Sequence, residues 1–222
     1  MDIKRNIRAI CSSLPESVKL VAVSKFHPVE SIKEAYEAGQ RIFGESRVQE
    51  LTAKQPVLPE DIEWHFIGTL QTNKVRYIAP FISMIQSVDS IRLLQEINRR
   101  AGECNRIIHV LIEVHIAEED SKHGFSPDEC KSLFTQKTLR QFPGVRVCGL
   151  MGMATFTDDA DRIRREFGIL RNLFKEIKSM PDTDKDIFTE LSMGMSDDYN
   201  TAIEEGSTMI RIGTGIFGTR EY

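Results

Sequence analysis

Short apolar runs alternate with amphipathic stretches along almost the whole chain, and this alternation constrains the fold more than any other feature. Eight runs are rich in valine, isoleucine and phenylalanine and short enough to be strands; they cover residues 19–24, 41–44, 63–67, 83–87, 107–115, 145–150, 187–191 and 209–212. Strand and helix in alternation with short loops imply a parallel sheet. Because eight such units in about 200 residues favour closure over an open sheet, we predict an α/β fold, a single (β/α)8 TIM barrel.

The stretches between the apolar runs have helical periodicity. The clearest helix is predicted over residues 159–178, where apolar side chains recur at three- and four-residue steps and form one stripe. A second is predicted over residues 90–102, with a serine as its N-cap. A third begins at Pro28 and stops at Gly39, residues that suit the first turn and the C′ position. An extra helix, over residues 3–13, precedes the first strand.

Composition limits the kind of protein and its partners. The 222 residues are 41% apolar and 28% charged, as in a globular protein, and no linker or composition shift divides them, so we predict one domain over residues 1–222. The net charge of −4 argues against nucleic acid or an anionic membrane as the main partner. No signal peptide or membrane span is evident. The scattered cysteines favour reduced thiols and a cytoplasmic location, and the histidines form no metal set.

Lys25 is the first candidate for chemistry. Function in a barrel of this kind collects at the C-terminal ends of the strands, and Lys25 directly follows the first predicted strand. Partial burial there would lower its pKa from about 10.4 and expose a neutral amine for carbonyl chemistry. The alternative is an ordinary lysine that reaches from a loop into solvent.

The loops after the seventh and eighth strands are rich in glycine and hydroxyl groups. Residues 192–198 read Ser-Met-Gly-Met-Ser-Asp-Asp, and residues 213–218 read Gly-Thr-Gly-Ile-Phe-Gly. These two loops commonly form a phosphate site in such barrels. Gly213 would let the backbone approach an anion, and the hydroxyls of Ser196 and Thr214 would donate to it. A helix N-cap is the alternative role for Ser196.

Residues 213–218 also match the pattern G-x-G-x-x-G of dinucleotide-binding sites. That pattern needs a following βαβ unit and an acidic residue about 20 positions further on. Only four residues follow Gly218. We therefore expect no nicotinamide site here.

Two polar residues lie within predicted strands. Arg211 stands between Ile210 and Ile212, so the alternation of a strand places its side chain on the opposite face from theirs. A guanidinium buried there needs a partner; it would be an acceptor at the barrel mouth, such as a pyridine nitrogen, or alternatively Glu190 in a salt bridge. His65, on the third strand, could line the mouth; a core or surface histidine is the alternative.

Several motifs in one order resemble a known family, the pyridoxal phosphate homeostasis proteins of the YggS/PROSC type, which are related to the barrel domain of alanine racemase. The match runs over nearly the whole chain. Its motifs are Val-Ala-Val-Ser-Lys at 21–25, Phe-Gly-Glu at 43–45, Trp-His-Phe-Ile-Gly at 64–68 with Leu-Gln-Thr-Asn-Lys at 70–74, Gly-Leu-Met at 149–151, and the segments 191–198 and 206–218.

The resemblance implies a type III fold barrel that binds pyridoxal 5′-phosphate (PLP). Lys25 would hold the cofactor as an aldimine, a Schiff base, and Met151 would lie near its ring. Arg211 would face the pyridine nitrogen and keep it unprotonated, which weakens the ring as an electron sink. The phosphate would be bound by Ser196, Gly213 and Thr214.

One position departs from the family pattern. The family commonly reads Phe-Gly-Glu-Asn, whereas this sequence has Ser46 as the fourth residue. The asparagine amide would lie near the cofactor, and the shorter Ser46 side chain would lose that contact or make it through water. Neither this change nor a local variant at residues 150–154 removes Lys25 or the phosphate loops.

The resemblance implies a carrier that buffers PLP or delivers it to apoenzymes, and we expect a monomer. The alternative is a PLP-dependent amino-acid racemase or isomerase of low activity. Racemases of this relationship need a second base, which in alanine racemase is a tyrosine on a separate β-domain that we do not expect here. Of the four tyrosines, Tyr36 and Tyr199 fall in helical stretches, and Tyr77 and Tyr222 have no evident site role. We therefore expect a non-enzymatic protein.

Overall fold

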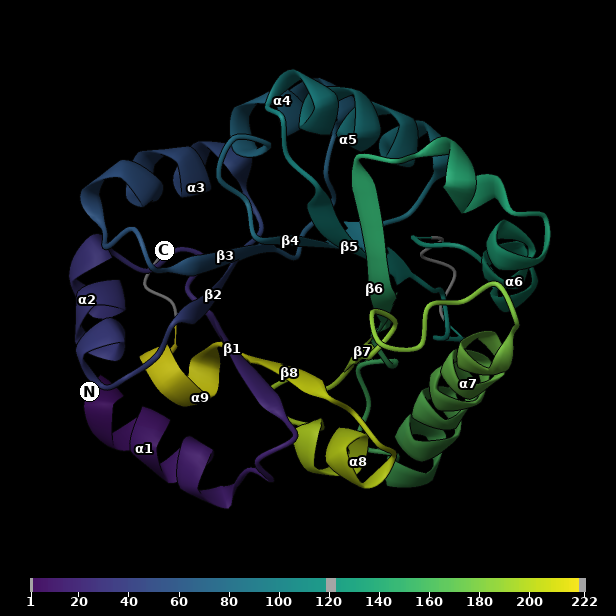
Figure 1. Ribbon diagram of the computed structural model, residues 1–222. Coiled ribbons are helices and arrows are strands. Elements are labelled where there is room, and N and C mark those ends of the chain that lie inside the picture. The colour runs from purple at the N-terminus through teal and green to yellow at the C-terminus, as the bar shows by residue number, and fades with distance from the viewer. Residues whose placement is uncertain (1, 119–122, 220–222) are drawn as a thin grey trace.

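The strands close into a barrel in the computed structural model, which describes residues 2–118 and 123–219 (Figure 1). All the strands run parallel, each pairs with the next in the sequence, and the first pairs with the last. They are β1 (Lys19–Val23), β2 (Ile42–Glu45), β3 (Glu63–Phe66), β4 (Met84–Val88), β5 (Ile108–Glu113), β6 (Val145–Met151), β7 (Glu190–Ser192) and β8 (Met209–Ile212). The predicted (β/α)8 barrel is confirmed.

Helices surround the strands as an outer ring (Figure 1). They are α1 (Ile3–Ser13), α2 (Val29–Glu37), α3 (Val48–Lys54), α4 (Val75–Ile78), α5 (Ile91–Glu103), α6 (Pro127–Thr135), α7 (Ala160–Ser179), α8 (Tyr199–Glu204) and α9 (Thr214–Phe217). Short 3-10 turns occupy Gln55–Val57, Thr72–Lys74 and Thr138–Gln141. The extra N-terminal helix has the predicted bounds, and Asn6 ties it to the end of the fold by donating to the carbonyl of Ile216 at 3.0 Å.

Helices α5 and α7 begin where the sequence predicts, whereas Pro28 is the N-cap of α2 and precedes its first turn. The side chain of Ser90 accepts from the N–H of Leu93 at the start of α5, and that of Asp159 accepts from the N–H of Arg162 at the start of α7. Each contact satisfies one of the backbone donors that a helix leaves unpaired at its N-terminus.

The seventh strand is shorter than predicted and begins later. Its apolar residues Ile187 and Phe188 belong to a turn, in which the N–H of Phe188 donates to the carbonyl of Asp184 at 2.8 Å. The ladder therefore starts only at Glu190, whose Cα lies opposite Gly149 of β6. An apolar run alone cannot separate a strand from the buried turn that leads into it.

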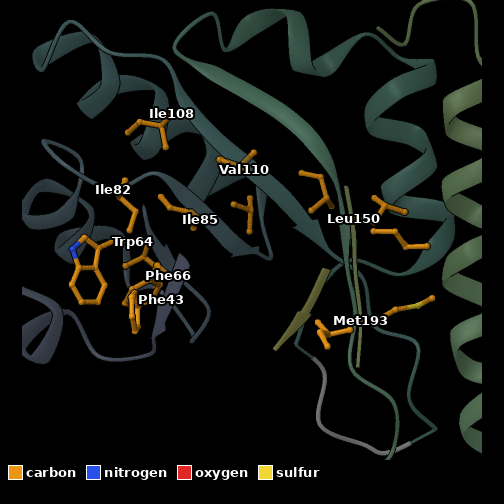
Figure 2. Close-up of a cluster of buried hydrophobic side chains, with 14 of the residues drawn as sticks. Phe43, Trp64, Phe66, Ile82, Ile85, Ile108, Val110, Leu150 and Met193 are labelled. Carbon is orange, nitrogen blue, oxygen red and sulfur yellow. The ribbon is translucent and has the colours of Figure 1, made fainter. Parts of the chain in front are cut away.

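The core has two parts because successive strand residues point to opposite faces. Outward-facing residues pack between the strands and the helices; Figure 2 shows Phe43, Trp64, Phe66, Ile85, Val110 and Leu150 among them. A separate inner cluster consists of Val21, Met84, Leu111, Cys148, Met151 and Met209. Among the described helices, none is both long enough and apolar enough to cross a membrane. All four cysteines are free.

Gly149 sets the contact between β6 and β7, and its substitution tests the barrel. A Cβ placed on Gly149 would lie 1.7 Å from the carbonyl oxygen of Glu190, and backbone cannot move aside as a flexible side chain can. We expect Gly149→Ala to lower the free energy of unfolding by about 1–3 kcal/mol or more, since overpacking usually costs an amount in that range. Urea denaturation followed by circular dichroism measures it.

Gly102 offers a matched control. It lies inside α5, and a Cβ placed on it meets no atom within 4 Å. Gly102→Ala should therefore keep the stability or raise it by up to about 1 kcal/mol. Equal stabilities of the two variants would contradict the close approach at Gly149.

Candidate functional site

Lys25 lies at the C-terminal end of the barrel, as predicted, and is half-buried. The N–H of Ser24 donates to the carbonyl of Gly44 at 3.0 Å and extends the pairing of β1 with β2. The chain then turns, with the N–H of His27 donating to the carbonyl of Ser24 and Phe26 in the left-handed region at a φ of 67°. Such a conformation is strained for a residue with a side chain and often marks a functional site.

A buried ammonium group lies beneath this turn. Lys54, the last residue of α3, is buried, and its Nζ donates to the carbonyl of Ser24 at 2.9 Å. The same Nζ contacts the carboxylates of Glu45 at 2.8 Å and Glu50 at 2.5 Å. With three acceptors around it, the amine of Lys54 is held as a charged structural group rather than as a nucleophile.

The Lys54 network fixes the backbone on both sides of Lys25. Glu50 accepts from the backbone N–H of Phe26 at 2.6 Å. On the other side, the Ser24 hydroxyl donates to Glu45 at 2.7 Å. Because Ser24 and Phe26 are the two sequence neighbours of Lys25, its position depends on this network.

Glu45 is the strained member of the network. Burial raises the pKa of its carboxyl group, while the charge of Lys54 and their hydrogen bond act in the opposite direction. One of its oxygens, Oε2, is buried and has no hydrogen-bond partner among the described residues. An uncompensated polar atom of this kind lowers stability and is unusual away from a functional site.

Arg211 is buried inside the barrel, with 4% of its surface exposed. Its guanidinium donates to the hydroxyl of Ser192 at 2.6 Å and to the carbonyl of Gly152 at 3.0 Å. The alternative of a salt bridge to Glu190 is wrong, because Glu190 pairs with Lys19 at 2.5 Å. Arg211 therefore lies below the loops after β6 and β7, on the side predicted from the strand alternation.

The charge of Arg211 is unpaired within the described part of the chain. Burial lowers the pKa of its guanidinium to about 10, and the carboxylates of Asp198 and Glu113 act in the opposite direction from a distance. The group is thus cationic at neutral pH. A guanidinium has five N–H donors, so Arg211 has donors to spare for a ligand.

Ser196 lies in the loop between β7 and α8 and is half-buried. The alternative N-cap role is wrong for it, because α8 begins after Asp198. Asp198 closes the turn by accepting from the N–H of Met195 at 2.5 Å. The Ser196 hydroxyl makes no hydrogen bond to another described residue.

The turn after β8 lies against the end of β1. A Cβ placed on Gly213 would lie 3.3 Å from the carbonyl oxygen of Val23, two residues before Lys25. Gly213 caps α9, and Thr214, the first residue of α9, is exposed. The fold therefore brings the eighth loop beside Lys25, as the predicted site requires.

Met151 and Ser46 also lie at this end of the barrel. Met151, 1% exposed, belongs to the inner cluster, and its Cα is paired with that of Ser192. Ser46 follows β2, and a Cβ placed on Gly68 would lie 2.6 Å from its carbonyl oxygen. The loops after β2 and β3 are therefore in close contact at Ser46.

His65 does not line this end, so that prediction is wrong. Its side chain lines a cavity at the opposite end of the barrel, together with Lys19 and Glu63, the first residues of β1 and β3. The His65 ring is 3% exposed and its Nδ1 lies 2.9 Å from Nε2 of Gln86. Alternation along a strand indicates which face a residue occupies, but not how deep it lies in the barrel.

The donor groups at the C-terminal end suit one kind of ligand. Lys25 offers an amine, Arg211 a buried guanidinium, and the loops with Ser196, Gly213 and Thr214 offer hydroxyl and backbone N–H groups. An aldehyde, an aromatic nitrogen and a phosphate on one molecule would match them. Among the described residues, no group of three histidine, cysteine or acidic side chains is placed to hold a metal ion.

Comparison with known proteins agrees with this assignment. Residues 1–221 match the family described as alanine racemase, N-terminal domain. A relative from Aquifex aeolicus named pyridoxal phosphate homeostasis protein is 43% identical over 205 residues, which cover 92% of this chain and 88% of the relative. One of the same name from Pasteurella multocida is 42% identical over 215 residues, 94% of this chain and 89% of the relative.

Solved structures give the same result. PipY of Synechococcus elongatus without PLP is 39% identical, with a TM-score of 0.88 over 97% of this chain and 100% of that chain. PipY with PLP bound is 38% identical, with a TM-score of 0.84 over the same shares of both chains. Alanine racemase from E. faecalis shares the fold, at 18% identity and a TM-score of 0.74 over 98% of this chain and 58% of that chain. The family predicted from the motifs is thus confirmed: the chain belongs to the pyridoxal phosphate homeostasis proteins, whose barrel is that of the alanine racemase N-terminal domain.

Proposed function

We propose that this protein binds PLP at the C-terminal end of its barrel and serves the intracellular homeostasis of the cofactor, by buffering it or delivering it to apoenzymes. The observation that carries the proposal is the Lys54 network, which holds both neighbours of Lys25. Strong family likeness supports it, since the named relatives are PLP homeostasis proteins and PipY has been solved with PLP bound.

Each predicted site residue except His65 has a role in this proposal. When bound, PLP supplies an aldehyde carbon that reacts with an amine, and Lys25 provides that amine. Arg211 donates to the pyridine nitrogen. Met151 contacts the ring from inside the barrel. Ser46 takes the position beside the cofactor that the family gives to asparagine. The phosphate is held by Ser196, Gly213 and Thr214.

A non-enzymatic role follows from the charge of Arg211 and from the tyrosines. A permanently charged donor keeps the pyridine nitrogen unprotonated, which makes carbanion chemistry unfavourable. Tyr36 donates to Asp61 at 2.7 Å, Tyr77 packs against Arg76, and Tyr199 packs against the outer core. Tyr222 lies outside the described residues. The proposed carrier is a cytoplasmic monomer.

Lys25 is tested by chemical trapping. Protein incubated with PLP should turn yellow, because a Schiff base of PLP absorbs visible light. Borohydride should then fix one pyridoxyl group on the peptide that contains Lys25. Lys25→Ala should lose the trapped adduct and keep weaker, non-covalent binding, because the phosphate loops are unchanged. Peptide mass spectrometry measures the site. An adduct on Lys54 in place of Lys25, or none at all, would refute the assignment.

Lys54 is tested through stability and cofactor retention. Lys54→Met leaves two carboxylates without their cation, so we expect the free energy of unfolding to fall by about 3–5 kcal/mol, as when a buried ion pair is broken. Covalent capture of PLP by Lys25 should slow in parallel. The double variant Glu45→Gln, Lys54→Met should recover part of the stability. Lys185→Met, at an exposed lysine, is the control and should change neither quantity.

The enzyme alternative is tested by racemisation. PLP-loaded protein supplied with either enantiomer of alanine should convert it no faster than free PLP, because Arg211 holds the ring in its less reactive form. Chiral chromatography measures both directions, with an alanine racemase as the positive control. Racemisation well above that of free PLP, and lost in Lys25→Ala, would favour the enzyme.

A further inference from the structure

A cavity of about 500 Å³ opens at the N-terminal end of the barrel, opposite the proposed PLP site. This end of such a barrel is normally closed by layers of bulky apolar side chains. Here the apolar residues Met84, Cys148 and Met209 form only part of the lining. The volume falls in the range of small-molecule sites, roughly 300–1,000 Å³.

Four neighbouring strands present a row of side chains to this cavity. The Cα pairings run from His65 to Met84, from Met84 to His109 and from His109 to Arg146, so these residues lie at the same height on β3, β4, β5 and β6. All four line the cavity. The row therefore offers two imidazoles and a guanidinium to whatever occupies it.

Buried hydrogen bonds determine which nitrogen of His65 carries the proton. The Arg211 guanidinium can only donate, so the Ser192 hydroxyl accepts from it at 2.6 Å, and the hydroxyl in turn donates to Oε1 of Gln86 at 2.7 Å. The amide of Gln86 is thereby oriented with Nε2 toward Nδ1 of His65, at 2.9 Å. An amide N–H only donates, so Nδ1 of His65 accepts.

The remaining nitrogen of His65 is a donor that faces the cavity. Burial, with the charge of Lys19 adding to it, lowers the pKa of the His65 ring to about 3, so the ring is neutral at physiological pH. A neutral imidazole that accepts at Nδ1 carries its proton at Nε2. That N–H makes no hydrogen bond to a described residue, although His65 as a whole is buried. It requires an acceptor from a ligand or from solvent.

Charges around the cavity select the ligand further. Lys19 and Glu190 neutralise one another at 2.5 Å. Arg146 on β6, Glu63 at the start of β3 and Asp186 just before β7 are exposed and form no ion pair with another described residue. A ligand with both an anionic and a cationic group would match these charges, whereas a simple anion would meet the two carboxylates unpaired.

We propose that this cavity is a second ligand site, which takes a zwitterionic α-amino acid with an apolar side chain. Its carboxylate accepts from His65 Nε2–H and pairs with Arg146. Its ammonium group pairs with Glu63, on the same strand as His65, and its side chain packs on Met84, Cys148 and Met209. The proposal goes beyond PLP binding and does not rest on it.

Nuclear magnetic resonance of the ¹⁵N-labelled, PLP-free full-length protein tests the site. The His65 imidazole should show a protonated Nε2 and an unprotonated Nδ1. At least one of L-alanine, L-leucine and L-methionine should shift that Nε2–H resonance saturably at millimolar concentration. Isocaproate, which lacks the ammonium group of leucine, and isoamylamine, which lacks its carboxylate, should each bind at least about tenfold more weakly.

Substitutions at exposed residues locate the ligand without disturbing the buried core. Arg146→Gln and Glu63→Gln should each weaken amino-acid binding about tenfold or more, the loss expected for one charged hydrogen bond. Arg92→Gln, at an exposed arginine of α5 that does not line the cavity, should not change amino-acid binding. Absence of a saturable shift with all three amino acids, binding unchanged in both variants, or equal binding of isocaproate would each overturn the proposal. PLP capture by Lys25 is measured separately, so failure here leaves the proposed function intact.

Discussion

The organisation of the barrel interior depends on one buried guanidinium. The Arg211 guanidinium has only donor atoms, so every group that hydrogen-bonds to it must accept. This requirement orients Ser192, then Gln86, and finally His65. A column of hydrogen bonds therefore runs from the proposed cofactor end of the barrel to the cavity at the other end. Apolar side chains would fill the same space without this cost in stability, because a buried charge left without partners is strongly destabilising.

A second buried cation, Lys54, holds the backbone around Lys25 at the C-terminal end of the barrel. Its ammonium group joins α3 to the end of β1, and so ties the position of Lys25 to the packing of a helix that begins more than twenty residues later in the sequence. The two cations have different roles. Arg211 has donors left for a ligand, whereas the acceptors around Lys54 are all supplied by the protein.

Sequence patterns predicted the parts of the site that depend on strand order. Lys25 and Gly213 follow strands that are neighbours in any closed barrel of eight, so their proximity needed only the correct fold. The depth of His65 could not be predicted, because it depends on the Cα pairing with Met84 and thus on the stagger of the strands. Lys54 gave no signal, since a lysine in the last turn of a helix ordinarily complements the helix dipole in solvent.

The column also explains which nitrogen of His65 carries the proton. Reversing the proton on His65 would require Gln86 to turn its carbonyl toward Nδ1, which would place its amide N–H groups against the Ser192 hydroxyl and leave that hydroxyl to find another acceptor. Ser192 already accepts a hydrogen bond from Arg211, and in the reversed arrangement its own hydroxyl proton loses the acceptor that Gln86 provides. The tautomer of His65 is therefore tied to the charge of Arg211 at the other end of the barrel. A ligand that accepts from His65 Nε2 therefore stabilises the same arrangement of hydrogen bonds, in which Arg211 donates to Ser192 and Ser192 donates to Gln86.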